Sequence, residues 1–310
     1  MSASRIEELV VSISIDTECD HDPNWVRSNP LAFESITEGL PNRLQPAFAD
    51  VGAVPTYLLT VEVLEDPDSV AALRSLPGDY EYGTHLHAAF IEPEKKFFDY
   101  AGVDSPDFQC ASSAEVEYQK LANLTSLFEG KLGYAPTSFR AGRYGAAAQS
   151  IDSLQRLGYK VDTSVTPHLR WSEPNASVDF RKAPEQPYFP APGTIIEPGE
   201  ASEQALLEVP ISVKPRLFRD PRWFRPWFAS VEQMKEVVRY QMKRHAQQRI
   251  LSINMMFHSM EVIEKASPYP QSESDVKRYI DDMQAALQWC ADEGARFVPL
   301  SDLHDLYLTA

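Results

Sequence analysis

The segment Leu9–Ile15 has the sequence Leu-Val-Val-Ser-Ile-Ser-Ile and is followed directly by Asp-Thr-Glu-Cys-Asp-His-Asp at residues 16–22. A short run of β-branched and apolar residues predicts a buried strand. Four carboxylates and a histidine within seven positions repel one another unless a cation lies among them. The stretch therefore predicts a strand that delivers acidic side chains at its carboxyl end, with an acidic, solvated loop as the alternative.

Further apolar runs follow, separated by longer amphipathic segments. We expect strands over residues 54–60, 80–87, 137–140, 159–163, 206–211, 250–258 and 296–300. Helical spacing, serine N-caps and terminal glycines predict helices over residues 40–51, 113–132, 146–157, 230–246 and 272–292. Strand–helix alternation favours parallel strands. About eight such units predict an α/β fold, a distorted (β/α) barrel of seven or eight parallel strands.

The composition is that of a globular protein. The chain has 310 residues, of which 43% are hydrophobic and 24% charged, and such a length suffices for a full core. Because α/β barrels routinely exceed 250 residues as one domain, we expect residues 1–310 to form a single catalytic domain. The net charge of −16 disfavours nucleic acid as a partner, since such a chain repels phosphate backbones.

The N-terminal segment and the cysteines indicate in which cellular compartment the chain is expected. Residues 1–10 lack a basic head followed by a long apolar run, and no stretch approaches the roughly 18 apolar residues of a membrane span. Cys19, Cys110 and Cys290 are scattered and form no Cys-x-x-Cys pair. We therefore expect a cytoplasmic chain without a membrane span or a disulfide framework.

The region 167–228 differs from the rest of the chain. Residues 167–203 are rich in Pro, Gly and Ser and show no period, which predicts a long loop with short strands on one face of the barrel. Residues 216–228 place four arginines among aromatic residues. This irregular insert is interpreted as either a substrate-specificity element or irregular packing. For residues 216–228 the alternatives are a packed loop and a carbohydrate or partner surface.

Reactive side chains of an α/β barrel collect just past the carboxyl ends of the strands. One expected strand ends in His85-Leu86-His87, and alternate residues of a strand point to one face. Two histidines plus one carboxylate, with a position open for water, are a catalytic zinc pattern. His258 closes another apolar run, where it is either an acid–base group or a structural histidine.

These strand-end motifs, in this order, resemble the polysaccharide deacetylases of the NodB-homology type (carbohydrate esterase family four). The resemblance spans Asp16 to about Leu300. Its five motifs are matched by residues 14–18, 84–87, 140–145, 162–167 and 255–259. Residues 257–259 together with Ser267-Pro268-Tyr269 are similar to a divergent, mostly bacterial subgroup that is associated with surface-polysaccharide gene clusters.

The chain departs from the family pattern at three places. The usual Asp-Asp pair is replaced by Asp16-Thr17-Glu18, so the ligand carboxylate would come from Glu18, Asp16 or Asp20. The second histidine of the second motif lies two positions after the first, and Ala89 stands four positions after it. Arg143 adds a residue within the third motif.

The resemblance implies hydrolysis of an N-acetyl group, or less readily an O-acetyl group, on a sugar. A divalent metal, expected to be zinc, would be held by His85, His87 and Glu18 and would polarise the acetyl carbonyl. Asp16 would act as general base toward water, with Arg140 keeping it ionised.

Further roles follow from the same resemblance. The Tyr144 backbone N–H would stabilise the oxyanion, and His258 would protonate the departing amine. Asp162 would orient His258 or contact substrate. Candidate sugar-stacking residues are Trp25, Trp171 and Tyr269.

Two alternatives remain at this point: a metal-independent C–N amidohydrolase on the same fold, acting on a cyclic amide or ureide, and a non-catalytic carbohydrate-binding protein. For a cytoplasmic deacetylase we expect an acetylated sugar or a surface-polysaccharide precursor, such as one for lipopolysaccharide or capsule, as substrate.

Overall fold

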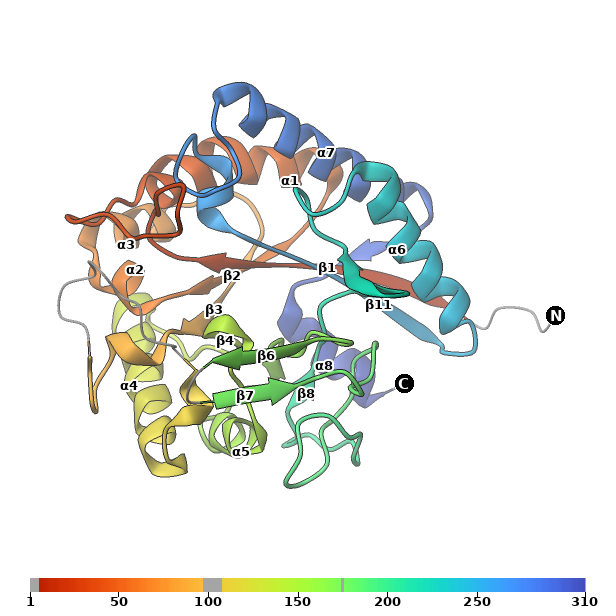
Figure 1. Cartoon of the computed structure of the whole chain (residues 1–310), viewed down its shortest axis with the longest axis horizontal. Coiled ribbons are helices and arrows are strands. Elements are labelled where there is room, and N and C mark those ends of the chain that lie inside the picture. Colours follow the sequence, from red (N-terminus) through yellow and green to blue (C-terminus); the bar gives the residue numbers. More distant parts are fainter. Residues whose placement is uncertain (1–5, 97–107, 174–175, 310) are drawn as a thin grey trace.

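The computed structural model of the chain describes residues 6–96, 108–173 and 176–309. A curled, wholly parallel sheet runs through its centre (Figure 1). In the order in which they lie side by side, its strands are β11 (Ile250–His258), β1 (Glu8–Thr17), β2 (Pro55–Leu59), β3 (Glu81–Leu86), β4 (Ser138–Ala141), β5 (Val161–Asp162) and β8 (Leu207–Glu208). A short strand, β12 (Arg296–Phe297), also pairs with β1. The expected distorted barrel is confirmed.

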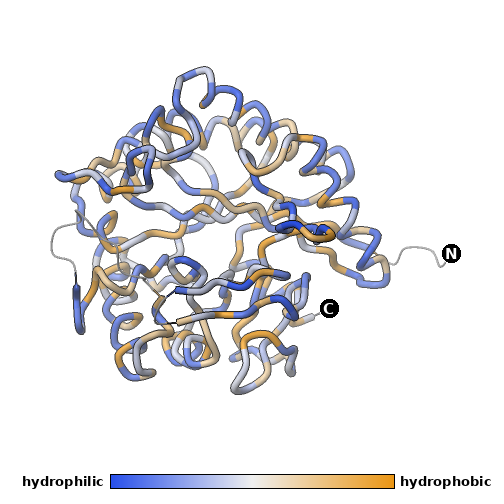
Figure 2. The backbone as a smooth tube through the Cα atoms, viewed as in Figure 1, coloured by the Kyte–Doolittle hydropathy of each residue, from blue (hydrophilic) through white to orange (hydrophobic). Residues whose placement is uncertain are grey.

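Helices cover the outside of this sheet. They are η1 (Ser35–Leu44), α1 (Gln45–Val51), α2 (Val61–Glu65), α3 (Pro67–Arg74), α4 (Ala114–Leu132), α5 (Ala148–Arg156), α6 (Val231–Arg244), α7 (Glu273–Asp292) and α8 (Leu300–Leu308). Figure 1 shows α1, α6 and α7 along one side of the sheet and α4 and α5 along the other. In Figure 2 the strands carry more hydrophobic colour than the outer stretches of these helices, as expected for a core between the two layers.

The helix boundaries follow local signals. Ser113, Ser230 and Ser272 each accept a hydrogen bond from a backbone N–H in the first turn of α4, α6 and α7. The first predicted helix, over residues 40–51, begins earlier than expected because η1 runs directly into α1. Three short helices, α2, α3 and α8, were not predicted, since five to nine residues contain too few turns for a clear period.

Alternation along β1 separates two environments. Val11, Ile13 and Ile15 are fully buried in the main hydrophobic core. Ser14 and Asp16 point to the opposite face, into the barrel, because successive strand residues alternate between faces. The barrel interior therefore holds a polar layer, and the candidate site lies at the end of this layer.

The barrel has a seam between β8 and β11, which are the two ends of the sheet. Ser212, four residues beyond β8, closes it: its N–H donates to the Asn254 carbonyl of β11 at 3.1 Å, and its hydroxyl accepts from the Asn254 N–H at 2.9 Å. The Gln186 side chain makes a similar bridge to the Ser252 backbone. These bonds satisfy polar groups that an open edge would leave without partners.

The irregular region 167–228 contains two antiparallel hairpins. One consists of β6 (Arg170–Glu173) and β7 (Ala176–Asp179), and the other of β9 (Val213–Arg216) and β10 (Arg219–Trp223). Figure 1 shows the β6–β7 hairpin beside the mouth of the sheet. Trp171 of β6 lies 6.5 Å from Trp223 of β10, measured between ring centroids, so the two hairpins meet. Within the described ranges, no helix has the length and apolarity needed to cross a membrane.

Candidate metal centre and active site

Strand register brings the predicted site residues together. Asp16 at the end of β1 is directly beside His258 at the end of β11. His85 of β3 is likewise beside Arg140 of β4. Because parallel strands all end at the same edge, four side chains that are up to 242 residues apart in the sequence share one end of the barrel.

Glu18, His85 and His87 form the tightest group of possible metal ligands. One oxygen of Glu18 (Oε1) lies 3.4 Å from His85 Nε2 and 3.3 Å from His87 Nε2. One ligand atom from each of the three residues lies within 4.8 Å of the others. Of the three side chains, Glu18 and His85 are buried and His87 is 11% exposed.

This donor set fits a divalent transition metal. Two imidazole nitrogens and one carboxylate oxygen are zinc ligands, and ligand atoms on one tetrahedral ion at about 2.1 Å lie about 3.4 Å apart. The two spacings from Glu18 match that value. Three protein ligands leave a position of a tetrahedral site for water or substrate, which is the arrangement of catalytic zinc sites.

The surroundings of the group fix its orientation. His85 Nδ1 lies 3.0 Å from the Arg140 carbonyl, and a Nδ1–H donor there turns the lone pair of Nε2 toward Glu18. The second oxygen of Glu18 (Oε2) accepts from Arg27 at 3.2 Å. A Cβ on Gly142 would stand 2.9 Å from the His87 ring, so only glycine lets β4 end against that imidazole.

The carboxylate of Glu18 is ionised in this setting. Burial by itself raises its pKa, but the neighbouring His87 and His85 imidazoles lower the pKa well below the usual value. Asp20, one of the alternative ligand carboxylates, instead accepts hydrogen bonds from the Glu34 and Ser35 N–H groups ahead of η1. Among the three carboxylates considered, Glu18 is thus the one that lies between the two histidines.

Asp16 occupies the centre of the site. Its Oδ2 lies 3.8 Å from both His85 Nε2 and His258 Nε2, and its Oδ1 accepts from Arg140 at 2.5 Å. Burial raises the pKa of Asp16, yet Arg140, His85 and His258 together hold the pKa below its ordinary value. Arg140 is fully buried and is held in turn by the Thr163 carbonyl at 3.0 Å. Asp16 is therefore a fixed, ionised carboxylate.

A buried glutamate, which the sequence analysis did not identify, orients His258. Glu261 Oε1 lies 2.9 Å from His258 Nδ1 and also accepts from Arg225, and Tyr279 donates to Oε2 at 3.2 Å. Burial raises the pKa of Glu261, but Arg225 and His258 outweigh that effect and lower it. An ionised Glu261 accepts a hydrogen bond from the Nδ1–H of His258. The other ring nitrogen, Nε2, then faces Asp16 and the cavity.

Asp162 is thus not the carboxylate that orients His258. It is fully buried, accepts from the Ser164 hydroxyl at 2.6 Å and lies beside Glu208 of the adjacent strand. Burial raises the pKa of both carboxyls, and the mutual repulsion of the pair raises that of Glu208 further. Strand-end position alone did not reveal that this side chain faces a second acid.

A cavity of about 390 Å³ opens over these groups. Its lining includes Glu18, His87, His258, Tyr144 and two of the expected stacking residues. Those two are Trp25, which is 39% exposed, and Trp171. The third, Tyr269, lies behind Trp25, with their ring centroids 5.5 Å apart.

Tyr144 is held by contacts on both sides. Its ring stacks on Trp171 at 5.3 Å, and its hydroxyl donates to the sulfur of Met256 at 3.4 Å. Tyr144 and the preceding Arg143 both have positive φ angles, 60° and 53°. Two consecutive left-handed residues that are not glycine are strained, and such strain is characteristic of functional sites.

Four residues that the sequence analysis did not single out also belong to the site: Arg27, Glu173, Arg225 and Glu261. Arg27 contacts Glu18, and Glu173 forms an ion pair with Arg143 at the cavity wall. Glu261 stands three residues after His258, and side chains at this spacing can contact each other across one helical turn. That spacing could have identified Glu261 as a partner of His258. The other three residues could not be identified in this way, because their partners are distant in sequence.

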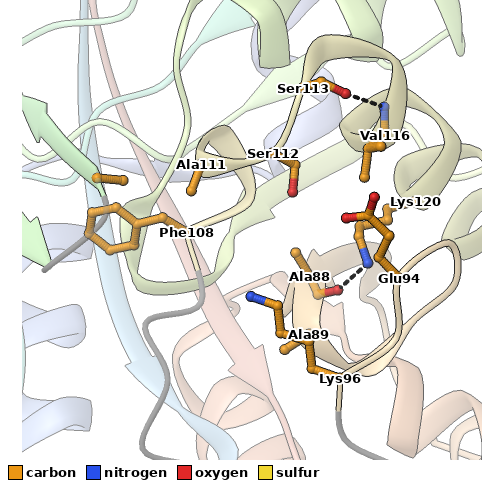
Figure 3. Close-up of a pocket in the computed structure, with 11 residues that line it drawn as sticks. Ala88, Ala89, Glu94, Lys96, Phe108, Ala111, Ser112, Ser113, Val116 and Lys120 are labelled. Carbon is orange, nitrogen blue, oxygen red and sulfur yellow. Dashed lines mark hydrogen bonds between the residues drawn. The ribbon is translucent and has the colours of Figure 1, made fainter.

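Among the described residues, a neighbouring cavity of about 350 Å³ shares only Phe108 with the one over the site (Figure 3). Lys120 reaches into its wall and donates to the Ala88 carbonyl at 2.8 Å, as the dashed line in Figure 3 shows. Its lining contains none of the strand-end carboxylates and histidines described above. This cavity is separate from the candidate metal centre.

Comparisons with known proteins inform the fold. No family model matches the sequence, and no curated protein sequence matches it. A solved structure described as a probable polysaccharide deacetylase from Pseudomonas aeruginosa PAO1 superposes with a TM-score of 0.54 at 13% identity, over 97% of this chain and 90% of that one. The chain has the fold of the polysaccharide deacetylases.

The same fold also carries another reaction. The crystal structure of Puue allantoinase superposes with a TM-score of 0.56 at 11% identity, over 99% of this chain and 91% of that chain. Since one fold hosts a deacetylase and an allantoinase, the fold does not choose the reaction. The choice depends on the groups at the strand ends.

Proposed function

We propose that this chain is a metal-dependent hydrolase that removes an acetyl group, preferentially an N-acetyl group, from a sugar or polysaccharide precursor. The observation that carries the proposal is the convergence of His85 Nε2 and His87 Nε2 on one Glu18 oxygen, at 3.4 and 3.3 Å. Glu18, His85 and His87 would hold the ion. When bound, a divalent metal there would polarise the acetyl carbonyl and acidify the attacking water.

The remaining groups of the site suit the two proton transfers. Asp16 Oδ2, held ionised by Arg140, lies 3.8 Å from His85 Nε2 and removes the proton from the attacking water. His258, on the other side of Asp16, presents Nε2 to the cavity and delivers a proton to the departing amine. Glu261 positions the ring through Nδ1 and compensates its positive charge once it is protonated.

Substrate orientation is assigned to the cavity walls. Trp25 and Trp171 both line the cavity and offer flat surfaces against which the C–H face of a sugar can pack. The Tyr144 backbone N–H, next to the strained Arg143, is assigned to the oxyanion. Tyr269 supports Trp25 from behind, at 5.5 Å between ring centroids.

A second candidate function is a metal-independent C–N hydrolase. The observation in its favour is Arg27, whose guanidinium lies 3.2 Å from Glu18 Oε2. With Arg27 and two imidazoles around it, the Glu18 charge can be balanced by protein groups alone. The similarity to the allantoinase fold is consistent with this alternative.

The two functions differ in metal content. We would measure zinc and other divalent ions in the purified chain and in the His85→Ala/His87→Ala variant, with His168→Ala/His245→Ala as control. The control removes two histidines that contact Glu185, outside the candidate centre. We expect about one equivalent of metal in the intact chain and the control, and its loss from the first variant.

Activity is then measured as acetate release from N-acetylglucosamine oligomers. We expect release by the intact chain and the control but not by the His85→Ala/His87→Ala variant. An intact chain that binds no metal after zinc addition would overturn the metal-dependent mechanism and favour the second candidate. Metal binding without hydrolysis of any acetylated sugar would favour a carbohydrate-binding protein.

A further inference from the structure

A cavity of about 560 Å³ adjoins the one over the candidate metal centre and shares Trp171 with it. Its walls come from both hairpins of the irregular region and from the start of α6. Trp171 stands on β6 and Trp223 on β10, so the side chains that divide and line the cavity are held by hydrogen-bonded strands. The mechanism described above does not use this cavity.

This cavity beside Trp171, called the second cavity below, is rich in guanidinium groups. Arg170, Arg216 and Arg222 line it together with a single acidic residue, Asp220. The net charge of the whole chain is −16, so this wall is a local exception to a strongly acidic surface. Such a concentration of positive charge attracts an anionic group.

The three arginines differ in what holds them. Arg222 donates to the Glu236 carboxylate at 2.7 Å. Arg216 Nε donates to a neutral acceptor, the Asp220 carbonyl, at 2.7 Å, and Arg170 donates to the Ser177 hydroxyl at 3.4 Å. Arg216 therefore has a position set by a neutral partner. Arg170 stands opposite Asp179 in the β6–β7 pairing, and the Asp179 carboxylate is bound by Arg181, so the charge of Arg170 is only partly compensated.

Aromatic rings connect this wall to the active site. Tyr144 stacks on Trp171 at 5.3 Å and lies 6.0 Å from Trp223. Trp223 contacts Phe228 at 6.1 Å, and Phe228 is 45% exposed. These rings contact one another from the wall of the first cavity to the wall of the second, and Trp171 lines both cavities.

We propose that the second cavity is a subsite for an acidic sugar residue, whose carboxylate is bound by Arg170 and Arg216 while its ring packs on Trp223 and Phe228. The proposal rests on the proposed action on a sugar chain and names its class: an oligosaccharide with a negatively charged residue next to the acetylated one. Guanidinium groups match carboxylates because both are planar and bond through two parallel contacts.

The test compares two probes that differ in charge. A hexasaccharide of alternating N-acetylglucosamine and glucuronic acid carries carboxylates, and an N-acetylglucosamine hexamer is neutral. We would measure their binding to the full, metal-loaded chain by calorimetry at low and high salt. We expect the acidic probe to bind about tenfold tighter or better at low salt, with the difference shrinking as salt screens the charges.

The variant Arg170→Gln/Arg216→Gln should remove most of this preference, because it should weaken binding of the acidic probe much more than binding of the neutral hexamer. The control Arg249→Gln/Lys277→Gln removes the same charge from exposed surface positions, 58% and 75% exposed, and should keep the preference. Equal binding of the two probes, or an unchanged preference in the first variant, overturns the subsite.

Binding is measured apart from acetate release, so the two proposals can fail separately. An arginine-dependent preference in a chain that hydrolyses neither probe supports the subsite and counts against the proposed hydrolysis. Hydrolysis of the neutral hexamer by a chain with no preference for the acidic probe supports the hydrolysis and overturns the subsite.

Discussion

Two pairs of buried carboxyl groups lie at strand ends of the same barrel, and their pKa values are shifted in opposite directions. Asp16 lies in the last two residues of β1 and Glu18 directly follows this strand, and Asp162 and Glu208 end β5 and β8. All four are at most 5% exposed. The pKa values of the first two are lowered and those of the second two are raised, although burial acts in the same direction on all four.

The neighbours make the difference. Arg140, His85 and His87 surround the first pair with positive or protonatable groups, and these outweigh the cost of burial. The second pair consists of two acids that face each other and share their environment with hydroxyl and backbone groups. A pair of acids alone retains a proton, whereas acids with cations stay ionised and can hold a metal or accept a proton.

The largest expected effect is on catalysis. Asp16→Asn keeps the size of the side chain but removes the base, so we expect turnover to fall by about 10²- to 10⁴-fold without unfolding. Asp162→Asn should retain turnover within a few-fold, because Asp162 lies beside Ser164 and Glu208, whereas Asp16 lies between His85 and His258. Acetate release by both variants, with circular dichroism as a check on folding, tests this contrast. Equal losses of turnover in the two variants would show that Asp16 and Asp162 do not differ in their roles.

The second effect is on stability. Arg140→Leu leaves the buried Asp16 without its main cation, which should cost about 3 to 5 kcal/mol in the free energy of unfolding. In a double-mutant cycle with Asp16→Asn, the combined variant should be more stable than the sum of the single losses by roughly 0.5 to 3 kcal/mol. Denaturant unfolding measures both values. Strict additivity would contradict a direct Asp16–Arg140 coupling.

The smallest effect concerns pH. In the unfolded chain both Asp162 and Glu208 ionise near their usual pKa of about 4. In the folded chain burial raises the pKa of Asp162 to about 6, and Glu208 is raised as well. Between these values the folded state binds more protons, so the free energy of unfolding falls as pH rises and the loss is complete above the folded pKa.

Glu208→Gln should reduce this decline between pH 4.5 and pH 8 by on the order of 1 to 3 kcal/mol. The measurement is denaturant unfolding at a series of pH values. Asp68→Asn changes an exposed acid on α3 and serves as the control, with the wild-type slope expected. A Glu208→Gln variant with an unaltered slope would exclude the shared proton of the buried pair.

Much of the fold was predictable because its signals are local. The strand runs at residues 9–15, 54–60 and 250–258 coincide closely with β1, β2 and β11. The His85-Leu86-His87 spacing predicted that both imidazoles point to one face, and both do contact Glu18. The β6–β7 hairpin was expected only as short strands in a loop. The β9–β10 hairpin was not predicted, since residues 216–228 were interpreted as a packed loop or a binding surface.

Less of the site was predictable from sequence. Glu18 was the expected ligand carboxylate, but Asp16 and Asp20 remained alternatives, because rotamer and chain direction after a strand are not local properties. The structure turns Asp20 toward the start of η1 and Glu18 toward the histidines. His258 was identified, and Asp162 was expected to orient it or to contact substrate, whereas in the structure Glu261 contacts the His258 ring.

The sequence by itself determined which chemical groups stand at the strand ends. The spacing of apolar residues, which marks where a strand runs and ends, is a property of residues close together in the chain. Only the tertiary structure decided which of those groups meet. Arg27 with Glu18, Arg225 with Glu261, and Asp162 with Glu208 are separated by 9, 36 and 46 positions. Their charge states follow from those contacts, since a carboxyl group responds to the charges and solvent within a few ångströms of it and not to its place in the chain.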